Sequence, residues 1–280
     1  MSSDERFVFT LWTADPRLAA AADAAGVDRI GVDLERLGKE DRQANRGTWI
    51  SPHREEDLEA VAPALSHARL FARVNPLNTG SAREVDAVLG RGVEVLMLPM
   101  VMNAAEAAAF TRLVDGRATV VLLVEHARAL EQLHEIVSVP GVNEIHIGLN
   151  DLAISLGLAN RWVALANGLI DDAAAIVHDA QLRFGLGGIG RAGDTSLPIP
   201  SDLVYAEFAR TGATAAVMAR SFFPERDPSL TLGVAPERPG MMREVSRARE
   251  ALDAWRRRTP EELAAAHAEL GRCAARTSAW

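Results

Sequence analysis

Short apolar runs alternate along the chain with longer, alanine-rich stretches, about eight times, as in a repeated strand–helix unit. Most of these runs are continuously apolar, which is typical of parallel strands that helices cover, whereas one-sided antiparallel strands alternate apolar with polar residues. The runs predict strands at FVFTLW (7–12), RIGVDL (29–34), RLFARV (69–74), VEVLMLP (93–99), ATVVLLVE (118–125), VNEIHIG (142–148), LRFGLGG (182–188) and TAAVMAR (214–220).

The stretches between these runs carry helix signals. Asp15 before Pro16, Ser81 and Asn103 stand where helix N-caps are expected, and several stretches close on glycine. Eight strand–helix units in about 250 residues predict an α/β fold, a (β/α)₈ barrel, with a doubly wound open sheet as the alternative. Helices are predicted at 16–26, 54–68, 81–92, 103–116, 127–138, 163–180 and 201–212.

The chain beyond residue 240 is helical and charged, with a break at Thr259-Pro260. One helix suffices to close a barrel, so residues 1–240 are assigned to the barrel and 241–280 to a C-terminal helical extension. The extension has apolar positions that favour packing on a neighbouring subunit, and we therefore expect a homo-oligomer. These positions are Trp255, Leu263 and Leu270.

Composition narrows the class of protein. Hydrophobic residues make up 48% and charged residues 24% of the 280 residues, as in soluble globular proteins. The net charge of −8 without a basic block argues against nucleic acid as a partner, and no apolar stretch is long enough to span a membrane. The polar start MSSDERFVFT does not resemble a secretory signal, and the single cysteine, Cys273, excludes an internal disulfide, so we expect a cytoplasmic protein.

Polar residues follow several predicted strands at the carboxyl end, the rim on which barrels build active sites. An isolated acid at a strand end is commonly a helix cap or an ion-pair partner, so it is their convergence from several strands that indicates chemistry. They are Asp33 and Glu35 after the second run, Arg73 and Asn75 after the third, Glu125 at the end of the fifth, and Asn150 and Asp151 after the sixth.

Glu125 and Asp151 are the candidate metal ligands. Glu125 ends the run VVLLVE, where an ionised carboxylate requires a cation, a metal or several hydrogen bonds to offset its desolvation. Asp151 follows the next strand around the barrel. Two hard oxygen ligands suit Mg²⁺ or Mn²⁺, which accept few protein carboxylates and keep positions for water and substrate.

Five segments together resemble a known family. They are GVDRIGVDLE, ARVNPLN, VEVLMLPMVMNAAEA, LLVEHARAL and GVNEIHIGLNDLAISLG. In this order they are similar to the successive motifs of the HpcH/HpaI aldolase and citrate lyase β-subunit superfamily, over about residues 7–223. The resemblance implies a metal-dependent (β/α)₈ barrel that makes or breaks a carbon–carbon bond next to an enolate of pyruvate or of an acyl thioester.

The resemblance also implies roles for single residues. It maps the family's metal ligands onto Glu125 and Asp151, and the arginine that meets the substrate's carboxylate or enolate oxygen onto Arg73. A fixed cation and a divalent metal both favour negative charge on that oxygen. An ion pair within the barrel is the alternative for Arg73. Asp33 and Glu35 are candidates for orienting water or moving a proton, and Asn150 for fixing the substrate's pose.

The chain departs from the aldolases after its second strand. Where they carry a histidine, thought to serve as the acid/base, DLERLGK has Arg36. The loop at residues 38–57 resembles a less characterised branch, associated with surface-polysaccharide or secondary-metabolite gene clusters. His53 is then a candidate acid/base, with helix capping or surface exposure as the alternative. Lys39, Arg42 and Arg46 are candidates for contacting an anionic or sugar-bearing substrate, or belong to a solvated loop.

The glycine-rich segment GLGGIG (185–190) formally fits a dinucleotide-binding fingerprint. It lies late in the chain, and RAGDTSLPIP follows it instead of a helix, so we do not expect a dinucleotide cofactor. Gly188 and Arg191 are instead candidates for substrate contact, with simple glycine packing as the alternative. His126 is expected to have a structural role, and His146 to be a satisfied core residue.

The leading hypothesis is a Mg²⁺- or Mn²⁺-dependent carbon–carbon lyase or aldolase of the class II type. It would act through the enolate of a small, pyruvate-like oxoacid or related acyl substrate, in a biosynthetic pathway. One alternative is a condensing enzyme, similar to citrate synthase or to an acyl-CoA lyase. Another is a barrel without activity that serves as a binding or scaffold subunit. The missing histidine favours this alternative, and the presence of Glu125, Asp151 and Arg73 argues against it.

Overall fold

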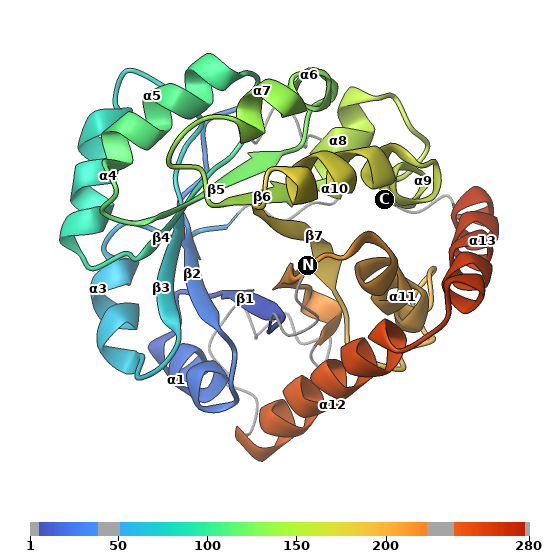
Figure 1. Ribbon diagram of the computed structural model, residues 1–280. Helices are drawn as coiled ribbons and strands as arrows, with labels where there is room; N and C mark the ends of the chain where they lie inside the picture. Colours follow the sequence, from blue (N-terminus) through green and yellow to red (C-terminus); the bar gives the residue numbers. More distant parts are fainter. Residues whose placement is uncertain (1–5, 39–50, 223–237, 278–280) are drawn as a thin grey trace.

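A closed barrel of eight parallel strands, in chain order, forms the centre of the computed structural model, which describes residues 6–38, 51–222 and 238–277 (Figure 1). Each strand pairs with the next, and β8 pairs with β1, so the barrel is confirmed and the open sheet is excluded. The strands are β1 (Val8–Trp12), β2 (Arg29–Asp33), β3 (Arg69–Arg73), β4 (Val95–Leu98), β5 (Thr119–Val124), β6 (Glu144–Ile147), β7 (Arg183–Ile189) and β8 (Ala215–Met218).

The strands are apolar throughout because both of their faces are buried. One set of side chains, including Ile30, Val32 and Leu70, packs against the surrounding helices in the main core. The alternate set fills the barrel, where an apolar cluster lies under the carboxyl rim. Its members are Phe71, Val95, Met97, Val121 and Leu123, with Trp12 packed against them.

The barrel also holds a buried ion pair. Arg29 of β2 donates to both carboxylate oxygens of Glu144 on β6, at 3.1 and 2.7 Å, and both side chains are buried. His146, two residues further along β6, lies 3.1 Å through Nε2 from the carbonyl oxygen of Gly187. His146 is therefore the satisfied core residue that the sequence predicts, and burial lowers its pKa.

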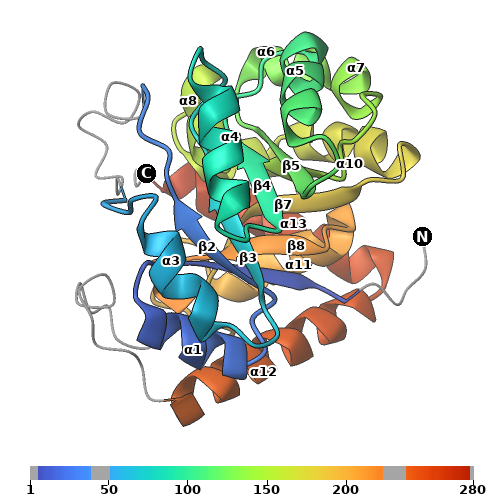
Figure 2. The same ribbon diagram turned by 90° about the vertical axis from the view of Figure 1, so that its left-hand side faces the viewer.

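Helices ring the barrel (Figures 1 and 2). The described helices are α1 (Pro16–Ala24), α3 (Asp57–Val61), α4 (Ser81–Gly90), α5 (Ala104–Val114), α6 (Ala127–Glu131), α7 (Leu133–Val137), α8 (Leu149–Ser155), α9 (Arg161–Ala166), α10 (Leu169–Asp179), α11 (Ser201–Thr211), α12 (Arg238–Arg256) and α13 (Pro260–Arg276), with short 3₁₀ turns at Ala62–Ala64 and Arg220–Phe222. None of the helices in these described ranges is long and apolar enough to cross a membrane.

The structure differs from the sequence prediction in several details, including an unpredicted helix, α8, and a helix at 54–68 that is reduced to α3 and a 3₁₀ turn. The helix predicted at 163–180 is two helices, because Gly168 adopts a positive φ of 85° between them. The helix predicted at 127–138 is likewise divided into α6 and α7. Ser81 is the first residue of α4 rather than its N-cap, which is Gly80, whereas the caps predicted at Asp15 and Asn103 are confirmed by their bonds to backbone N–H groups.

The last two helices pack on the chain's own barrel. Helix α12 lies between α11 and α1 and closes the helical ring, and α13 covers α11 and α9 (Figure 1). Leu270, one of the apolar positions of the extension, is fully buried in this packing. Helix α13 is therefore the one helix of the extension that the ring around the barrel does not need. Packing of the extension on a neighbouring subunit stays a prediction.

Asn160 joins the barrel to α13. Its side-chain oxygen caps α9 by accepting from the N–H groups of Trp162 and Val163, at 3.0 and 3.2 Å. Its amide nitrogen donates to the carbonyl oxygens of Ala274 and Thr277 at the end of α13, at 3.1 and 2.8 Å. The side chain is fully buried, so its loss would leave several polar groups without partners.

We expect Asn160→Ala to lower the free energy of unfolding by about 2–4 kcal/mol, since it removes a helix cap and two buried donors. Asn103→Ala, which removes the cap of α5, should cost about 1 kcal/mol. Urea denaturation followed by circular dichroism measures both. Equal losses for the two variants would show that α13 is not anchored through Asn160.

Candidate active site

The acids and the arginine predicted from the strand ends come together at the carboxyl rim. Asp33 and Arg73 are register partners at the ends of β2 and β3. Nε and Nη2 of Arg73 each donate to one oxygen of Asp33 at 2.8 Å, and Nη1 lies 3.3 Å from Oε2 of Glu35. The ion pair considered as the alternative for Arg73 is therefore present.

This ion pair is largely buried. The side chains of Arg73, Asp33 and Glu35 are 16%, 7% and 1% exposed. Burial alone lowers the pKa of Arg73, but the carboxylates of Asp33, Glu35 and Glu125 outweigh it and hold the pKa above its ordinary value. Arg73 is thus a permanent, immobilised cation at the rim.

Trp12 supports the arginine from inside the barrel. The guanidinium carbon of Arg73 lies 5.4 Å from the centre of the Trp12 ring, and this ring stacks on Phe71 at 4.9 Å. Gly31 of β2 makes room for it, because a Cβ there would lie 2.4 Å from the indole ring. The sequence analysis did not identify Trp12. Its signal is the glycine within the strand run RIGVDL, which marks a close approach.

Glu125 follows β5 and is only 4% exposed. Its Oε1 accepts from the N–H of Met100 at 3.1 Å. Met100 has a positive φ of 54°, uncommon for a residue other than glycine, and this turn after β4 presents its N–H to the carboxylate. Gly148 leaves space on the other side, because a Cβ there would lie 2.7 Å from Oε2 of Glu125. Neither Met100 nor Gly148 was identified from the sequence.

Negative charge exceeds positive charge around Glu125. Burial, and then repulsion from the carboxylates of Glu35 and Asp151, raise the pKa of Glu125 to about 8, although Arg73 and the Met100 N–H oppose the shift. Asp151 lies in the first turn of α8 and is 8% exposed. The neighbouring protein groups therefore do not hold the carboxyl of Glu125 in its ionised form at its ordinary pKa.

A divalent cation fits this arrangement. Hard carboxylate oxygens on a crowded, buried acid cluster are the donors that Mg²⁺ and Mn²⁺ prefer, and an added positive charge would relieve the repulsion. Within the described ranges, no group of three or more His, Cys, Asp or Glu side chains is arranged to hold a metal. An ion at Glu125 and Asp151 would therefore depend on further oxygens from water or substrate, as Mg²⁺ commonly does.

His53 is the predicted residue that approaches this cluster from the loop after β2. Its Nδ1 accepts from the backbone N–H of Asp33 at 3.1 Å. Lys39, Arg42 and Arg46, predicted to contact the substrate, lie outside the described residues. Asn150 contacts Arg161 of α9, whose Nη1 donates to its side-chain oxygen at 3.1 Å.

The other predicted contacts lie along β7 and the loop that follows it. Gly188 is exposed at a register shift between β7 and β8, and Arg191 lies 3.8 Å from Asp194. Among the described residues, neither Gly188 nor Arg191 contacts the acids of the cluster.

GLGGIG lies almost entirely within β7, and α11 begins only at Ser201, so the strand–turn–helix context of a dinucleotide site is absent from this described segment. His126 caps α6, as its expected structural role predicts.

A protein-family model described as HpcH/HpaI aldolase/citrate lyase matches residues 6–180. The chain belongs to the HpcH/HpaI aldolase/citrate lyase family. The matched span contains Asp33, Arg73, Glu125 and Asp151. It ends before β7, so the resemblance expected over about residues 7–223 is shown as far as residue 180.

Solved structures have the same fold. A family protein from Burkholderia cenocepacia is 20% identical, with a TM-score of 0.61 over 79% of this chain and 91% of that chain. The protein CitE from Mycobacterium tuberculosis, in complex with magnesium and acetate, is 18% identical, with a TM-score of 0.59 over 96% and 98%. The citrate synthase SbnG is 16% identical, with a TM-score of 0.58 over 77% and 86%. No curated protein sequence matches the chain.

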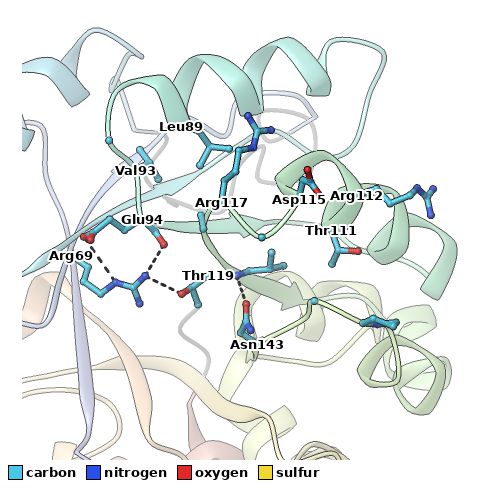
Figure 3. A pocket seen from close by; sticks show the side chains of 16 residues that line it. Arg69, Leu89, Val93, Glu94, Thr111, Arg112, Asp115, Arg117, Thr119 and Asn143 are labelled. Carbon is cyan, nitrogen blue, oxygen red and sulfur yellow. Dashed lines mark hydrogen bonds and ion pairs between the residues drawn. The ribbon is translucent and has the colours of Figure 1, made fainter.

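A separate groove lies at the amino rim of the barrel, opposite the acid cluster. Its volume is about 850 Å³, and it is lined by residues at the amino ends of β3 to β6 (Figure 3). Arg69 is held there by the carbonyl oxygen of Glu94 at 2.8 Å and by the hydroxyl of Thr119 at 3.0 Å. The groove therefore does not belong to the acid cluster, which lies at the other ends of the same strands.

The raised pKa of Glu125 makes a prediction about stability. In the unfolded chain this carboxyl ionises near its ordinary pKa of 4.5, and in the folded protein near 8, so folding without metal becomes less favourable as pH rises between these values. Glu125→Gln keeps the shape and removes the charge. We expect its thermal midpoint without metal to exceed that of the wild type at pH 8, with a smaller difference at pH 5.

Glu94→Gln is the matched control for this measurement. Glu94 has a 53% exposed side chain at the opposite rim, and its removal should give no pH-dependent gain. If Glu125→Gln were no more stable than the wild type at pH 8, Glu125 would not be a strained, buried acid.

Proposed function

We propose that this family member is a Mg²⁺- or Mn²⁺-dependent carbon–carbon lyase or aldolase that acts through the enolate of a pyruvate-like oxoacid. The observation that carries the proposal is one immobilised arginine, Arg73, beside the crowded acids Glu125 and Asp151. A substrate with a carboxylate and a neighbouring keto group needs positive charge near its oxygens. Arg73 supplies one such charge, and a metal ion bound by the two acids would supply another.

Glu125 and Asp151 would hold the divalent ion. When bound, the ion supplies Lewis-acid stabilisation of negative charge on the substrate's oxygens. Magnesium and acetate in the complex of CitE, a protein of the same fold, support this assignment. To hold a metal, the carboxyl of Glu125 would have to give up its proton, because a ligating carboxylate must be ionised.

Arg73 would bind the substrate's carboxylate and stabilise the enolate oxygen. Asp33 and Glu35 together contact all three nitrogens of its guanidinium, and Trp12 supports its face, so little reorganisation is needed when charge develops on the substrate. Preorganised cations of this kind contribute more in a buried site than in water.

Proton transfer is assigned to Glu35. Both carboxylate oxygens of Asp33 accept hydrogen bonds from Arg73, so Asp33 positions the arginine. Glu35 meets the same guanidinium through one nitrogen at 3.3 Å, and its side chain is buried beside the cluster. A carboxylate within this cluster is a suitable group to take a proton from the carbon next to a keto group.

A condensing enzyme is the second candidate. The likeness in fold to the citrate synthase SbnG favours it, because condensation uses the same type of enolate in the synthetic direction. A barrel without activity is less well supported. The burial and repulsion that raise the pKa of Glu125 cost stability, and a purely structural barrel would gain nothing in return.

We expect the wild-type protein with Mn²⁺ to exchange the methyl protons of pyruvate with deuterated water, and to lose this activity when the metal is chelated. Arg73→Lys should lower the exchange rate by about 100-fold or more, since a point charge cannot replace the fixed planar guanidinium. Arg69→Lys, at the other end of β3, should keep the wild-type rate. Proton NMR of pyruvate measures all three.

Absence of metal-dependent exchange with pyruvate, oxaloacetate and other small oxoacids would contradict the proposal. Formation of a citrate-like product from oxaloacetate and an acyl thioester would instead identify the condensing enzyme.

A further inference from the structure

The chain after β2 is tied to the segment that carries His53. Nη2 of Arg36 donates to the carbonyl oxygens of His53 and Pro52, at 2.7 and 3.3 Å. The backbone N–H groups of Arg36 and Leu37 donate to the side-chain oxygen of Asn75, at 2.8 and 3.0 Å. Arg36 is therefore fixed by its main chain while its side chain holds the returning segment.

Asn75 is itself held firmly. Its backbone N–H and its side-chain amide both donate to Oε1 of Glu84 on α4, at 3.1 and 2.8 Å. Glu84 is partly withdrawn from water, and this burial raises the pKa of its carboxyl. A continuous set of hydrogen bonds thus connects α4 with the main chain around His53.

The bond from Asp33 determines which nitrogen of His53 carries the proton. A backbone N–H can only donate, so Nδ1 accepts, and the neutral ring has its hydrogen on Nε2. To act as a base through Nε2, the ring would need a lone pair on Nε2 and its hydrogen on Nδ1. In a protonated ring, the Nδ1–H would likewise point at the N–H of Asp33. Either state breaks the bond to Asp33. This geometry opposes the predicted acid/base role of His53.

The same bond places the His53 ring against the main chain of Asp33, the residue whose carboxylate binds Arg73. Strand β1 ends at Trp12, and the last bond between β1 and β2 runs from the N–H of Thr13 to the carbonyl of Gly31. At Asp33 the ring of His53 takes over as hydrogen-bond acceptor. On the β3 side the main chain around Asp33 stays paired, as the bond from the N–H of Leu34 to the carbonyl oxygen of Arg73 shows, whereas on the β1 side the N–H of Asp33 is bonded to a side chain rather than to a strand.

We propose that His53 is a positioning residue that aligns Asp33 and, through it, Arg73, and that Arg36 keeps His53 in place. The role of Arg73 toward substrate in this inference rests on the function proposed above. The alignment itself is a property of the protein without substrate or metal. Arg36 thus acts on Arg73 indirectly, because it holds His53, which holds the main chain of Asp33.

Two substitutions of His53 separate positioning from proton transfer. In His53→Asn the amide oxygen can take the place of Nδ1, whereas nothing replaces Nε2; in His53→Ala both are lost. We expect His53→Ala to speed hydrogen exchange of the Asp33 amide and of the Arg73 Nε–H by about tenfold, and His53→Asn to restore slow exchange. NMR on the full-length protein without metal measures both signals.

Activity should follow the same order. With Mn²⁺ and pyruvate, His53→Ala should raise KM and lower kcat, and His53→Asn should recover most of both. Arg36→Ala should resemble a milder His53→Ala, while Arg54→Ala, a change of another exposed arginine in the same segment, should resemble the wild type.

Two results would overturn the inference. One is unchanged exchange of the Asp33 amide in His53→Ala, which would show that the ring does not hold that N–H. The other is slow amide exchange in His53→Asn together with activity as low as in His53→Ala, which would show that the ring itself moves a proton. A wild-type protein inactive toward oxoacids would contradict the proposed function, and the amide and Arg73 Nε–H measurements would still decide the positioning.

Discussion

The paired hydrogen bonds between Arg73 and Asp33 are the contact on which the rest of the site depends. They fix a permanent cation at the carboxyl rim, yet burial and the nearby charges of Glu35 and Asp151 still raise the pKa of Glu125. A buried excess of carboxylates costs folding free energy unless a cation joins it. The destabilising acids lie together at the carboxyl rim. Such a cluster is expected of a binding site rather than of a packing core.

The supporting residues explain how the barrel bears such a cluster. Below Arg73, Trp12 and Phe71 form a stacked apolar column, and Gly31 supplies the space that the indole needs. Beside Glu125, the backbone of Met100 donates a hydrogen bond from a left-handed turn. The charges are thus positioned by rigid strands and by main-chain groups, and small displacements of either would misplace these charges.

The sequence predicted most of the barrel because both faces of each strand are buried, and continuous apolar runs such as VVLLV have few other interpretations. It predicted the convergence of Arg73, Asp33 and Glu125 for the same reason, since parallel strands end at one rim. It missed α8 and the break at Gly168, where local backbone geometry decides the outcome. It also missed Trp12, Met100 and the acceptor role of His53. These depend on a close approach, a left-handed residue and a tautomer, which tertiary contacts determine.

Anomalous X-ray scattering from crystals soaked with Mn²⁺ and oxalate, an analogue of the pyruvate enolate, tests the account most directly. The account predicts one manganese ion bound by the carboxylates of Glu125 and Asp151, with oxalate beside the guanidinium of Arg73. Manganese bound elsewhere, or none at this rim with Glu125 and Asp151 unchanged, would contradict it.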